Sequence, residues 1–440
     1  MNTSDKSRER SFVLNAFRPG TAIDTPRRFA GRKQHIAALS DAIQTHGTCP
    51  VIFGERGLGK TSVAMQIDRI ARGDIELLQD LDLSQHAIPE GQRYATFYLA
   101  CTDDIRSKNE LLHRIINLSA GHIDDFSGLR LESESKKNKV DLKVFQSEVV
   151  SSYTARHRLQ EYINLSVEEQ LLVCLNWVAD KLQRPVLVIL DEFDRVRSHH
   201  GLASLIKSAS SETLKFMLVG VAHDVSSLLM EHQSLERLLV PVSIERMSDA
   251  ELEKIIVLVV RTLRDHQLAV GFDSDAAKSL VKAAQGLPWF IHILGQDALI
   301  AAYDARESTI TSADIQSVIN HIATSRYARQ FQDQYLNVVG DSFHREIVLR
   351  AFARWPSRDI PTSEIYPIAH ALGVSNPSQC VKELMTVRCG RTLAKAPFRA
   401  KGTYAFTNIM FKRYVNLRRA VYSRLDERID AAWEAHFGTR

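Results

Sequence analysis

The chain has 440 residues, of which 45% are hydrophobic and 25% charged, and its formal net charge is +4. This composition is typical of a globular protein with two or three domains and excludes large-scale disorder. No apolar stretch approaches the length of a membrane span, and the first residues lack the apolar core of a signal peptide. We therefore expect a cytoplasmic protein without a membrane partner. Its five cysteines have no C-x-x-C spacing, which predicts buried thiols and no metal site built from them.

Residues 1–24 are expected to be an N-terminal tail, and residues 25–247 an α/β core. Within the core, five short apolar runs predict strands at residues 49–53, 94–101, 186–190, 216–222 and 240–246. Helical patterns separate these runs, which indicates a parallel sheet. The interval between the second and third strands is longer than one crossover helix needs, so we expect a surface insertion at about residues 120–160.

The first expected strand leads into a phosphate-binding loop. Residues 54–61 read GERGLGKT and match the pattern G-x-x-x-x-G-K-[ST]. In this pattern, glycines let backbone N–H groups surround a β-phosphate at the start of a helix, the lysine reaches the β- and γ-phosphates, and the hydroxyl binds Mg²⁺. The sequence therefore predicts that ATP and Mg²⁺ are bound by Gly54, Glu55, Arg56, Gly57, Leu58, Gly59, Lys60, Thr61 and Ser62.

A second signal lies at the end of the third expected strand, where VLVIL is followed by DEFD. The run has no polar alternation, which is typical of a parallel strand buried on both faces. Asp191 can then hold the Mg²⁺ shell, and Glu192 can orient and deprotonate an attacking water. The alternative is a buried strand that simply surfaces into an acidic turn.

Only helices are expected directly after the core. Ser248 and Glu251 form a capping box that opens the helical segment 248–327, with further helices at 274–284, 289–305 and 312–323. Residues 328–440 contain helical patterns at 343–353, 362–372 and 378–387. Two short strands with a turn at Gly402 follow, and then a long helical end. Helix, helix, helix and hairpin is the order of a winged helix.

This order of elements resembles the AAA+ and STAND ATPases over about residues 25–425, in particular the origin-recognition-type initiators and the bacterial STAND-like ATP-binding proteins. The resemblance implies a P-loop NTPase of α/β class, with a parallel five-stranded sheet, an α-helical lid and a C-terminal winged-helix domain.

The resemblance also implies roles for residues outside the two motifs. Phe29 and Arg32, in the segment FAGR, match the box that packs near the adenine; the alternative is a loop with a useful glycine. His223 or Asp224 stands where the family has a polar sensor of the γ-phosphate. The alternative is a solvated loop after a buried strand. Arg237 resembles the arginine finger that one subunit offers to its neighbour, or it forms a surface salt bridge.

In the lid, the segment Gly286-Leu287-Pro288 has the STAND form, and the following helix lacks the arginine of the AAA+ pattern. Pro288 and His292 are therefore expected near the nucleotide, although a lone histidine among apolar residues is more often a core residue. This departure favours a slow switch that stays nucleotide-bound for most of its cycle.

The basic residues gather near the C-terminal end of the chain. Residues 381–420 contain ten basic residues and one acid, a local balance of +9. With a recognition helix at about 378–388 and a wing at 395–401, duplex DNA contacts are expected at Arg388, Arg391, Lys395, Arg399 and Lys401. The alternative is a solvated face or a protein contact.

Three functions remain compatible with the sequence. The first is an oligomeric, DNA-associated ATPase that acts as a switch or loader for a partner protein. The second is a STAND-like signalling ATPase that activates a separate effector, for example in antiphage defence, without binding DNA. The third is structural ATP binding without turnover, against which Glu192 argues because a site that only binds needs no base.

Overall fold

The computed structural model describes residues 3–120, 162, 164–196, 201–220, 237–396 and 399–438. It divides into two compact units. The core unit holds Ala22–Glu55 and Gly59–Glu245, and the helical unit holds Met1–Thr21, Arg56–Leu58 and Arg246–Arg440. Nearly all of the expected insertion at 120–160, and the candidate sensors His223 and Asp224, lie outside the described residues.

The core unit is built on a five-stranded parallel sheet with the order β2-β3-β4-β1-β5. The strands are β1 (Cys49–Phe53), β2 (Ala95–Ala100), β3 (Val186–Asp191), β4 (Leu214–Gly220) and β5 (Leu239–Ser243). The expected α/β class and parallel five-stranded sheet are confirmed. Because all strands are parallel, their carboxyl ends share one edge of the sheet, so the segments that follow β1 and β3 leave the sheet at that edge.

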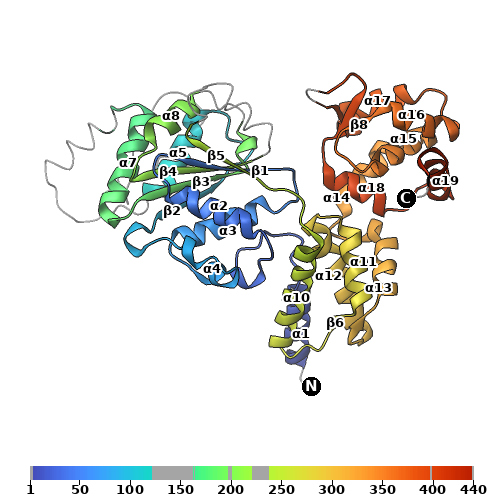
Figure 1. Ribbon diagram of the computed structural model, residues 1–440, viewed down its shortest axis with the longest axis horizontal. Coiled ribbons are helices and arrows are strands. Elements are labelled where there is room, and N and C mark those ends of the chain that lie inside the picture. Colours follow the sequence, from blue (N-terminus) through green and yellow to red (C-terminus); the bar gives the residue numbers. More distant parts are fainter. Residues whose placement is uncertain are drawn as a thin grey trace. The chain divides into compact units, whose positions relative to one another are not determined.

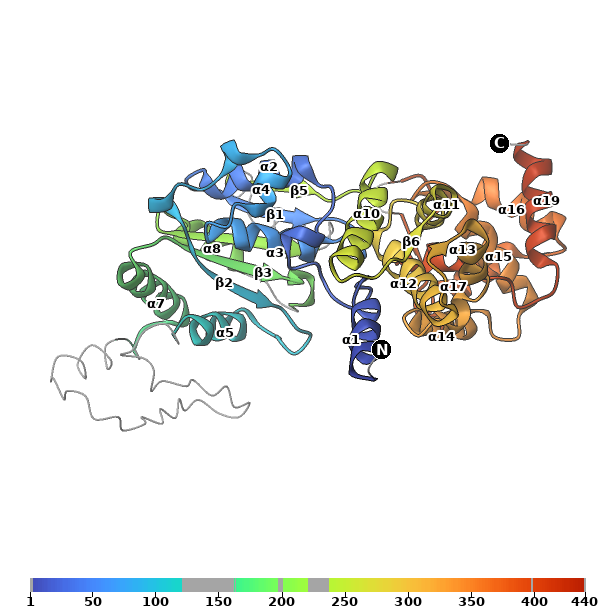
Figure 2. The same cartoon turned by 90° about the horizontal axis from the view of Figure 1, so that it is seen from below.

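Helices cover both faces of this sheet, as Figures 1 and 2 show. One face carries α2 (Lys33–Gln44) and α3 (Lys60–Ala71), and the other carries α5 (Lys108–Ala120), α7 (Val167–Leu182) and α8 (Leu202–Ala209). Every residue of β3 is buried, as its unbroken apolar run predicts. Shorter helical segments of this unit are η1 (Pro26–Arg28), α4 (Glu76–Asp80), η2 (Ser84–His86), η3 (Glu90–Gln92) and η5 (Phe193–Arg195).

The first part of the helical unit is a helix cluster. It contains α10 (Asp249–Asp265), α11 (Ser274–Ala284), α12 (Pro288–Ala305), α13 (Ser312–Asn320) and η7 (Ile322–Thr324), with a small parallel pair of β6 (Gly271–Phe272) and β7 (Thr309–Ile310). The capping box expected at the start of α10 is present, with Ser248 and Glu251 each bonded to the other's backbone N–H. The helical segment predicted after the core is therefore observed.

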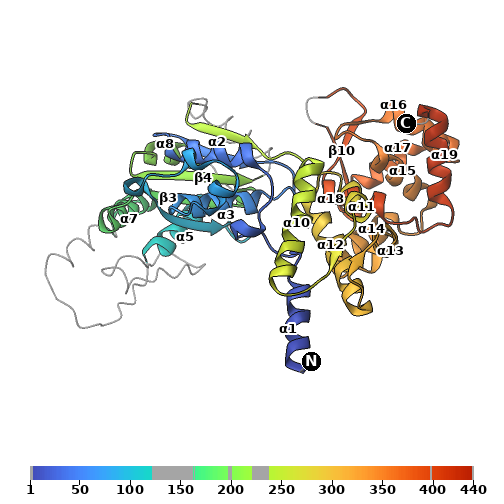
Figure 3. The ribbon, with the colours of Figure 1, turned by 60° about the horizontal axis from the view of Figure 1, so that its bottom comes forward.

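The first residues of the chain differ from the expected tail. Thr3–Leu14 form helix α1, which packs against α12 (Figure 3). The buried Gln296 amide donates to the Val13 carbonyl at 2.9 Å, and the Trp289 indole donates to the Pro19 carbonyl at 2.9 Å. Phe17 lies against Gly295, where an added Cβ would stand 2.5 Å from the ring. These contacts make the N-terminal segment part of the helical unit.

The remainder of the helical unit contains a winged helix. Its elements are α14 (Arg329–Val339), α15 (Phe343–Arg354), β8 (Ile360–Pro361), α16 (Thr362–Ala371), α17 (Pro377–Leu384), η8 (Val387–Cys389), β9 (Leu393–Lys395), β10 (Thr403–Phe406), α18 (Ile409–Leu417) and α19 (Leu425–Phe437). The strands β8, β10 and β9 form an antiparallel sheet in that order, and the connection between β9 and β10 is the wing. The predicted winged helix is confirmed, and α19 packs on α16 and α15 (Figure 3).

A buried polar network holds α19 in place. Arg350, 2% exposed, donates to the Tyr335 hydroxyl at 2.9 Å and pairs with Asp426 at the start of α19. Glu346 is fully buried and accepts from the Val421 backbone N–H at 2.7 Å and from the Tyr335 hydroxyl. Each buried charge is thus hydrogen-bonded, which is the condition for its burial to be tolerated.

No helix in the described ranges is long and apolar enough to cross a membrane.

Candidate nucleotide-binding site

The loop after β1 has the backbone that a phosphate-binding loop requires. Gly54 has φ 152°, and a Cβ added there would stand 2.5 Å from the Ile244 carbonyl oxygen, so only glycine fits. Helix α3 begins at Lys60, and the first backbone N–H groups of a helix have no intrahelical acceptor and attract anions. Lys60 Nζ donates to the Gly54 and Glu55 carbonyls, each at 2.9 Å, which holds the ammonium group over the loop.

Asp191 lies at the end of β3 with its carboxylate oriented by two donors. The Tyr98 hydroxyl donates to Oδ2 at 2.6 Å, and the Glu192 backbone N–H donates to Oδ1 at 2.8 Å. Asp191 is only 3% exposed, so water does not compete freely for these positions. Burial, and then the charge of Asp191, raise the pKa of Tyr98 far above its ordinary value, so the phenol stays protonated and donates.

Glu192 follows directly, in a left-handed conformation with φ 51°. This conformation ends β3 and starts the short η5 turn. The Glu192 side chain is 45% exposed and forms an ion pair with Arg195, Nε to Oε2, at 3.0 Å. The acidic pair therefore combines one buried carboxylate, held by two donors, with one half-exposed carboxylate that is paired with Arg195. That division suits a metal ligand followed by a base.

The residues present fit a Mg²⁺–nucleotide. The Thr61 hydroxyl and the Asp191 carboxylate would be the protein ligands, since Mg²⁺ keeps several waters and is usually bound by one or two side chains together with phosphate oxygens. In the part of the chain that is described, no group of three or more His, Cys, Asp or Glu side chains could hold a metal ion by itself. When bound, the ion would neutralise phosphate charge.

The segment before α2 is fixed beside α3. Ser62 Oγ accepts from the Ile23 backbone N–H at 2.9 Å, and the buried Gln66 amide donates to the Ile23 carbonyl at 3.0 Å. Phe29 is 6% exposed and Arg32 is 4% exposed, and Arg32 Nη1 donates to the Glu245 carbonyl at 2.7 Å. The FAGR box is thus packed within the core unit, and its place beside an adenine stays a prediction.

The other candidate residues have separate environments. Arg237 is an exposed residue in the turn before β5. Pro288 is the first residue of α12, and His292 Nδ1 accepts from the Arg18 backbone N–H at 3.3 Å. The His292 ring also packs at a steep angle against Phe17, with 6.0 Å between ring centroids. His292 therefore contacts the N-terminal segment of its own unit.

Sequence reasoning missed two residues of the site, Tyr98 and Arg195. Tyr98 was read only as part of a strand, and its hydroxyl reaches Asp191 because of the register that pairs Tyr98 with Ile189 across β2 and β3. Arg195 stands three residues after Glu192, a spacing that brings side chains together in a 3₁₀ turn. This spacing from Glu192 was the one sequence feature that could have predicted the contact of Arg195 with Glu192.

The basic C-terminal segment is only partly available to a ligand. Lys412 Nζ donates to the Trp355 and Ser357 carbonyls at 2.6 and 2.8 Å, and Arg418 donates to Gln332 at 2.8 Å. These cations stabilise the fold, so the sequence count of +9 overstates the exposed charge.

Arg413 is likewise engaged inside the helical unit. It donates to the Ala283 carbonyl at the end of α11 at 2.6 Å. Burial, with Arg246 nearby, lowers its pKa to about 10. The nearest carbonyls, rather than an external anion, therefore satisfy this guanidinium.

The five residues expected to contact DNA are all exposed. Arg388 lies in η8 and Lys395 ends β9, while Lys401 belongs to the wing. Arg391 has a left-handed backbone, with φ 48°. Arg399 forms an ion pair with Asp359 at 2.7 Å. DNA contact by these residues stays a prediction.

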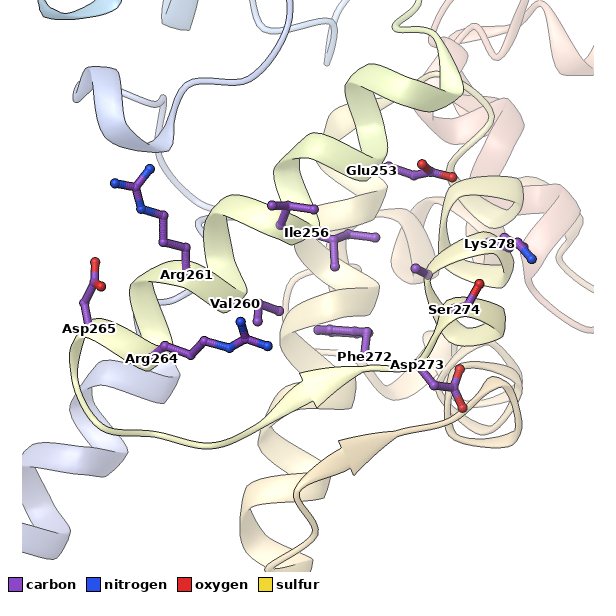
Figure 4. Close-up of a pocket in the computed structure, with 12 residues that line it drawn as sticks. Glu253, Ile256, Val260, Arg261, Arg264, Asp265, Phe272, Asp273, Ser274 and Lys278 are labelled. Atoms are coloured by element: carbon purple, nitrogen blue, oxygen red, sulfur yellow. The ribbon is translucent and has the colours of Figure 1, made fainter. Parts of the chain in front are cut away.

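A separate groove of about 710 Å³ lies between α10 and α11 (Figure 4). Its apolar floor includes Val260 and Phe272, and Arg264 extends from α10 toward Phe272. Acidic and basic residues alternate around its rim. The groove has no assigned occupant and shares no lining residue with the phosphate-binding loop.

No family model and no curated protein matches the chain. Among solved structures, it is similar to a Walker-type ATPase of Pyrococcus abyssi at 14% identity and a TM-score of 0.47, covering 90% of this chain and 99% of that one. The ORC2 protein of Aeropyrum pernix matches at 14% identity and a TM-score of 0.48, covering 91% and 93%. The ORC1 protein of the same organism, solved in complex with DNA, matches at 16% and 0.44, covering 96% of each chain.

Proposed function

We propose that this chain binds and hydrolyses Mg-ATP as an AAA+/STAND-type ATPase and acts as an oligomeric, DNA-associated switch or loader for a partner protein. The observation that carries the proposal is the pairing of Asp191 and Glu192 at the same sheet edge as the phosphate-binding loop. Asp191 is buried and oriented by two donors, whereas the Glu192 side chain is 45% exposed. A site that only bound nucleotide would need the first carboxylate but not the second.

In the proposed cycle, the loop N–H groups and Lys60 would hold the phosphates, while Thr61 and Asp191 would hold the ion. Glu192 accepts a proton from the attacking water at its carboxylate. Arg237, supplied to a neighbouring copy, would stabilise charge that develops on the transferred phosphoryl group. The candidate sensors His223 and Asp224 lie outside the described residues, so the proposed cycle assigns them no step.

The first experiment measures ATP binding by calorimetry and steady-state hydrolysis for three proteins. Lys60→Ala should lose both binding and hydrolysis, because the ammonium contacts the phosphates. Glu192→Gln should keep binding and lower kcat by about 100-fold or more, the usual contribution of a general base. Equal turnover in Glu192→Gln would exclude its role, and intact affinity in Lys60→Ala would exclude the phosphate-loop assignment.

The second experiment tests DNA association. Hydrolysis is measured with and without duplex DNA at low and moderate salt, because phosphate contacts weaken as salt rises. Neutralising Lys395 and Lys401 together should remove any stimulation, whereas Lys254→Gln, an exposed lysine on α10, should not. Stimulation that survives the double substitution would contradict a DNA role for the wing.

Arg237→Ala tests the oligomer. Its hydrolysis should fall only at protein concentrations at which subunits associate, since a finger acts on the neighbouring copy. Full activity of the variant in an associated state would contradict a role in trans.

A second candidate function is a STAND-like signalling ATPase that activates a separate effector without binding DNA, for example in antiphage defence. The observation that favours it is the internal engagement of Lys412, Arg413 and Arg418, which leaves a smaller exposed basic surface than the sequence indicates. Hydrolysis that ignores DNA at every salt concentration would favour this function over the first.

A further inference from the structure

Both oxygens of the Glu192 carboxylate are bound by one side chain, that of Arg195. Nε lies 3.0 Å from Oε2, and Nη2 donates to Oε1 at 3.3 Å. The two residues are three apart in the η5 turn, which the Arg195 backbone N–H closes by donating to the Glu192 carbonyl at 2.9 Å. Side chains at this spacing lie on the same side of a 3₁₀ turn, so the turn itself presents the guanidinium to the carboxylate.

Arg195 also has a second carboxylate within reach. Its Nη1 lies 3.8 Å from Asp103 Oδ2, on the segment that follows β2. This segment is anchored, because Cys101 donates its backbone N–H to the Asp191 carbonyl at 2.8 Å. The neighbouring Asp104 pairs with Arg114 at 2.5 Å. Arg195 therefore stands between two carboxylates, with Glu192 closer and Asp103 at the limit of an ion pair.

We propose that Arg195 is a positioning residue that restrains Glu192, and that Asp103 is the competing partner that draws the guanidinium away. This inference rests on the proposed function, in which Glu192 is the base. A base must reach the proton of the attacking water within hydrogen-bond distance. Both oxygens of the Glu192 carboxylate are bound to the guanidinium of Arg195 in the same turn. The carboxylate must therefore leave Arg195 before it can accept a proton from the attacking water.

The strength of the restraint follows from exposure. The side chains of Arg195 and Glu192 are 37% and 45% exposed, so the pair belongs to the weak, solvent-screened class. Loss of such a pair corresponds to roughly a two- to fivefold change in the population of released Glu192. The restraint therefore modulates turnover, and competition from the Asp103 carboxylate for Arg195 weakens it.

The test uses the full chain and compares Arg195→Ala, Arg195→Lys and Asp103→Asn by kcat, KM and ATP affinity. Arg195→Ala should raise kcat about two- to fivefold with ATP affinity unchanged, because the phosphates are bound elsewhere. Arg195→Lys, which keeps the charge but cannot grip both oxygens, should give an intermediate kcat. Asp103→Asn should lower kcat, since Arg195 then has one partner only.

Non-additivity separates this role from a merely structural one. Because Asp103 acts through Arg195, the double variant should match Arg195→Ala alone. As a matched control, Lys278→Ala removes another ion pair of i, i+3 spacing, with Asp275, and should leave kcat unchanged. A kcat for Arg195→Ala at or below that of the wild type, or an Asp103→Asn effect that persists without Arg195, would overturn the proposal.

Glu192→Gln distinguishes failure of this inference from failure of the proposed function. If Glu192→Gln abolishes hydrolysis and Arg195→Ala leaves kcat unchanged, the base is right and the restraint is wrong. If Glu192→Gln turns over as the wild type does, both are wrong. In the Arg195→Ala background, Glu192→Gln should remove the whole gain.

Discussion

Replacing Tyr98 by Phe removes one hydroxyl from the site and leaves the ring. The lost hydrogen bond to Asp191 is 2.6 Å long and goes to a carboxylate that is 3% exposed. Hydrogen bonds to charged groups contribute about 1.5–3 kcal/mol, and water cannot readily replace this one. We expect the core unit to lose about 2 kcal/mol. For a unit of this size, that corresponds to a fall of roughly 4–8 °C in its melting temperature.

The same change should affect Mg²⁺ use more than ATP affinity. Tyr98 orients the carboxylate that would hold the ion, and loss of such an orienting partner typically weakens metal affinity or activity by about tenfold or more. The assay is ATP hydrolysis as a function of Mg²⁺ concentration, together with thermal unfolding. We expect the half-maximal Mg²⁺ concentration to rise about tenfold.

Tyr94→Phe provides the matched control. Its hydroxyl donates to the Ile43 carbonyl, a neutral acceptor, at 2.5 Å in the same unit. This change should cost about 1 kcal/mol of stability, because the bond is neutral, and should leave the Mg²⁺ dependence as it is. If the two variants had the same Mg²⁺ dependence, Tyr98 would only stabilise the fold, and the assignment of Asp191 to the ion would lose its support.

Three further predictions concern stability. Burial lowers the pKa of Lys215 to about 8 from 10.5. Between these pH values the unfolded chain binds the extra proton at this lysine, so Lys215 by itself should make the free energy of unfolding rise with pH by up to about 3 kcal/mol. Buried thiols such as Cys49, whose pKa is raised, act in the opposite direction, so the rise is measured as the difference between the wild type and Lys215→Met in denaturant titrations. Gly295→Val should destabilise the helical unit by about 2 kcal/mol in thermal unfolding, since even a Cβ would stand 2.5 Å from the buried Phe17 ring. Arg350→Ala should cost about 3 kcal/mol, because it removes a buried guanidinium that bonds Asp426, the Tyr335 hydroxyl and the Arg418 carbonyl, and should increase proteolysis within α19.

The sequence predicted the elements whose signal is local. The sequence predicts the buried strand β3 and the bounds of α11 at residues 274–284, because strand burial and helix periodicity depend on neighbouring residues. The phosphate-binding loop was predicted for the same reason, since its glycines, lysine and hydroxyl lie within eight positions.

What the sequence missed depends on residues far apart in the chain. The Tyr98 contact needs the register between β2 and β3, which are separated by the longest interval in the core. The sequence predicts a tail where helix α1 forms, because the residues of α12 that α1 packs against lie almost 300 residues later. The charge count failed at Lys412 and Arg418 for a similar reason, as composition does not show which cations bind carbonyls and amides inside the fold.

The helical unit is built from residues that precede the core in the sequence and residues that follow it, and this has a consequence for biosynthesis. Helix α1 precedes the core in the chain, but its packing partner α12 begins only at Pro288. At about 5–20 residues per second, α1 leaves the ribosome roughly 15–55 s before that partner is made. During this time the core can complete its sheet while α1 waits, so α1 docks late. A chaperone or an N-terminal fusion that captures α1 in that interval would delay the helical unit and leave the core largely unaffected.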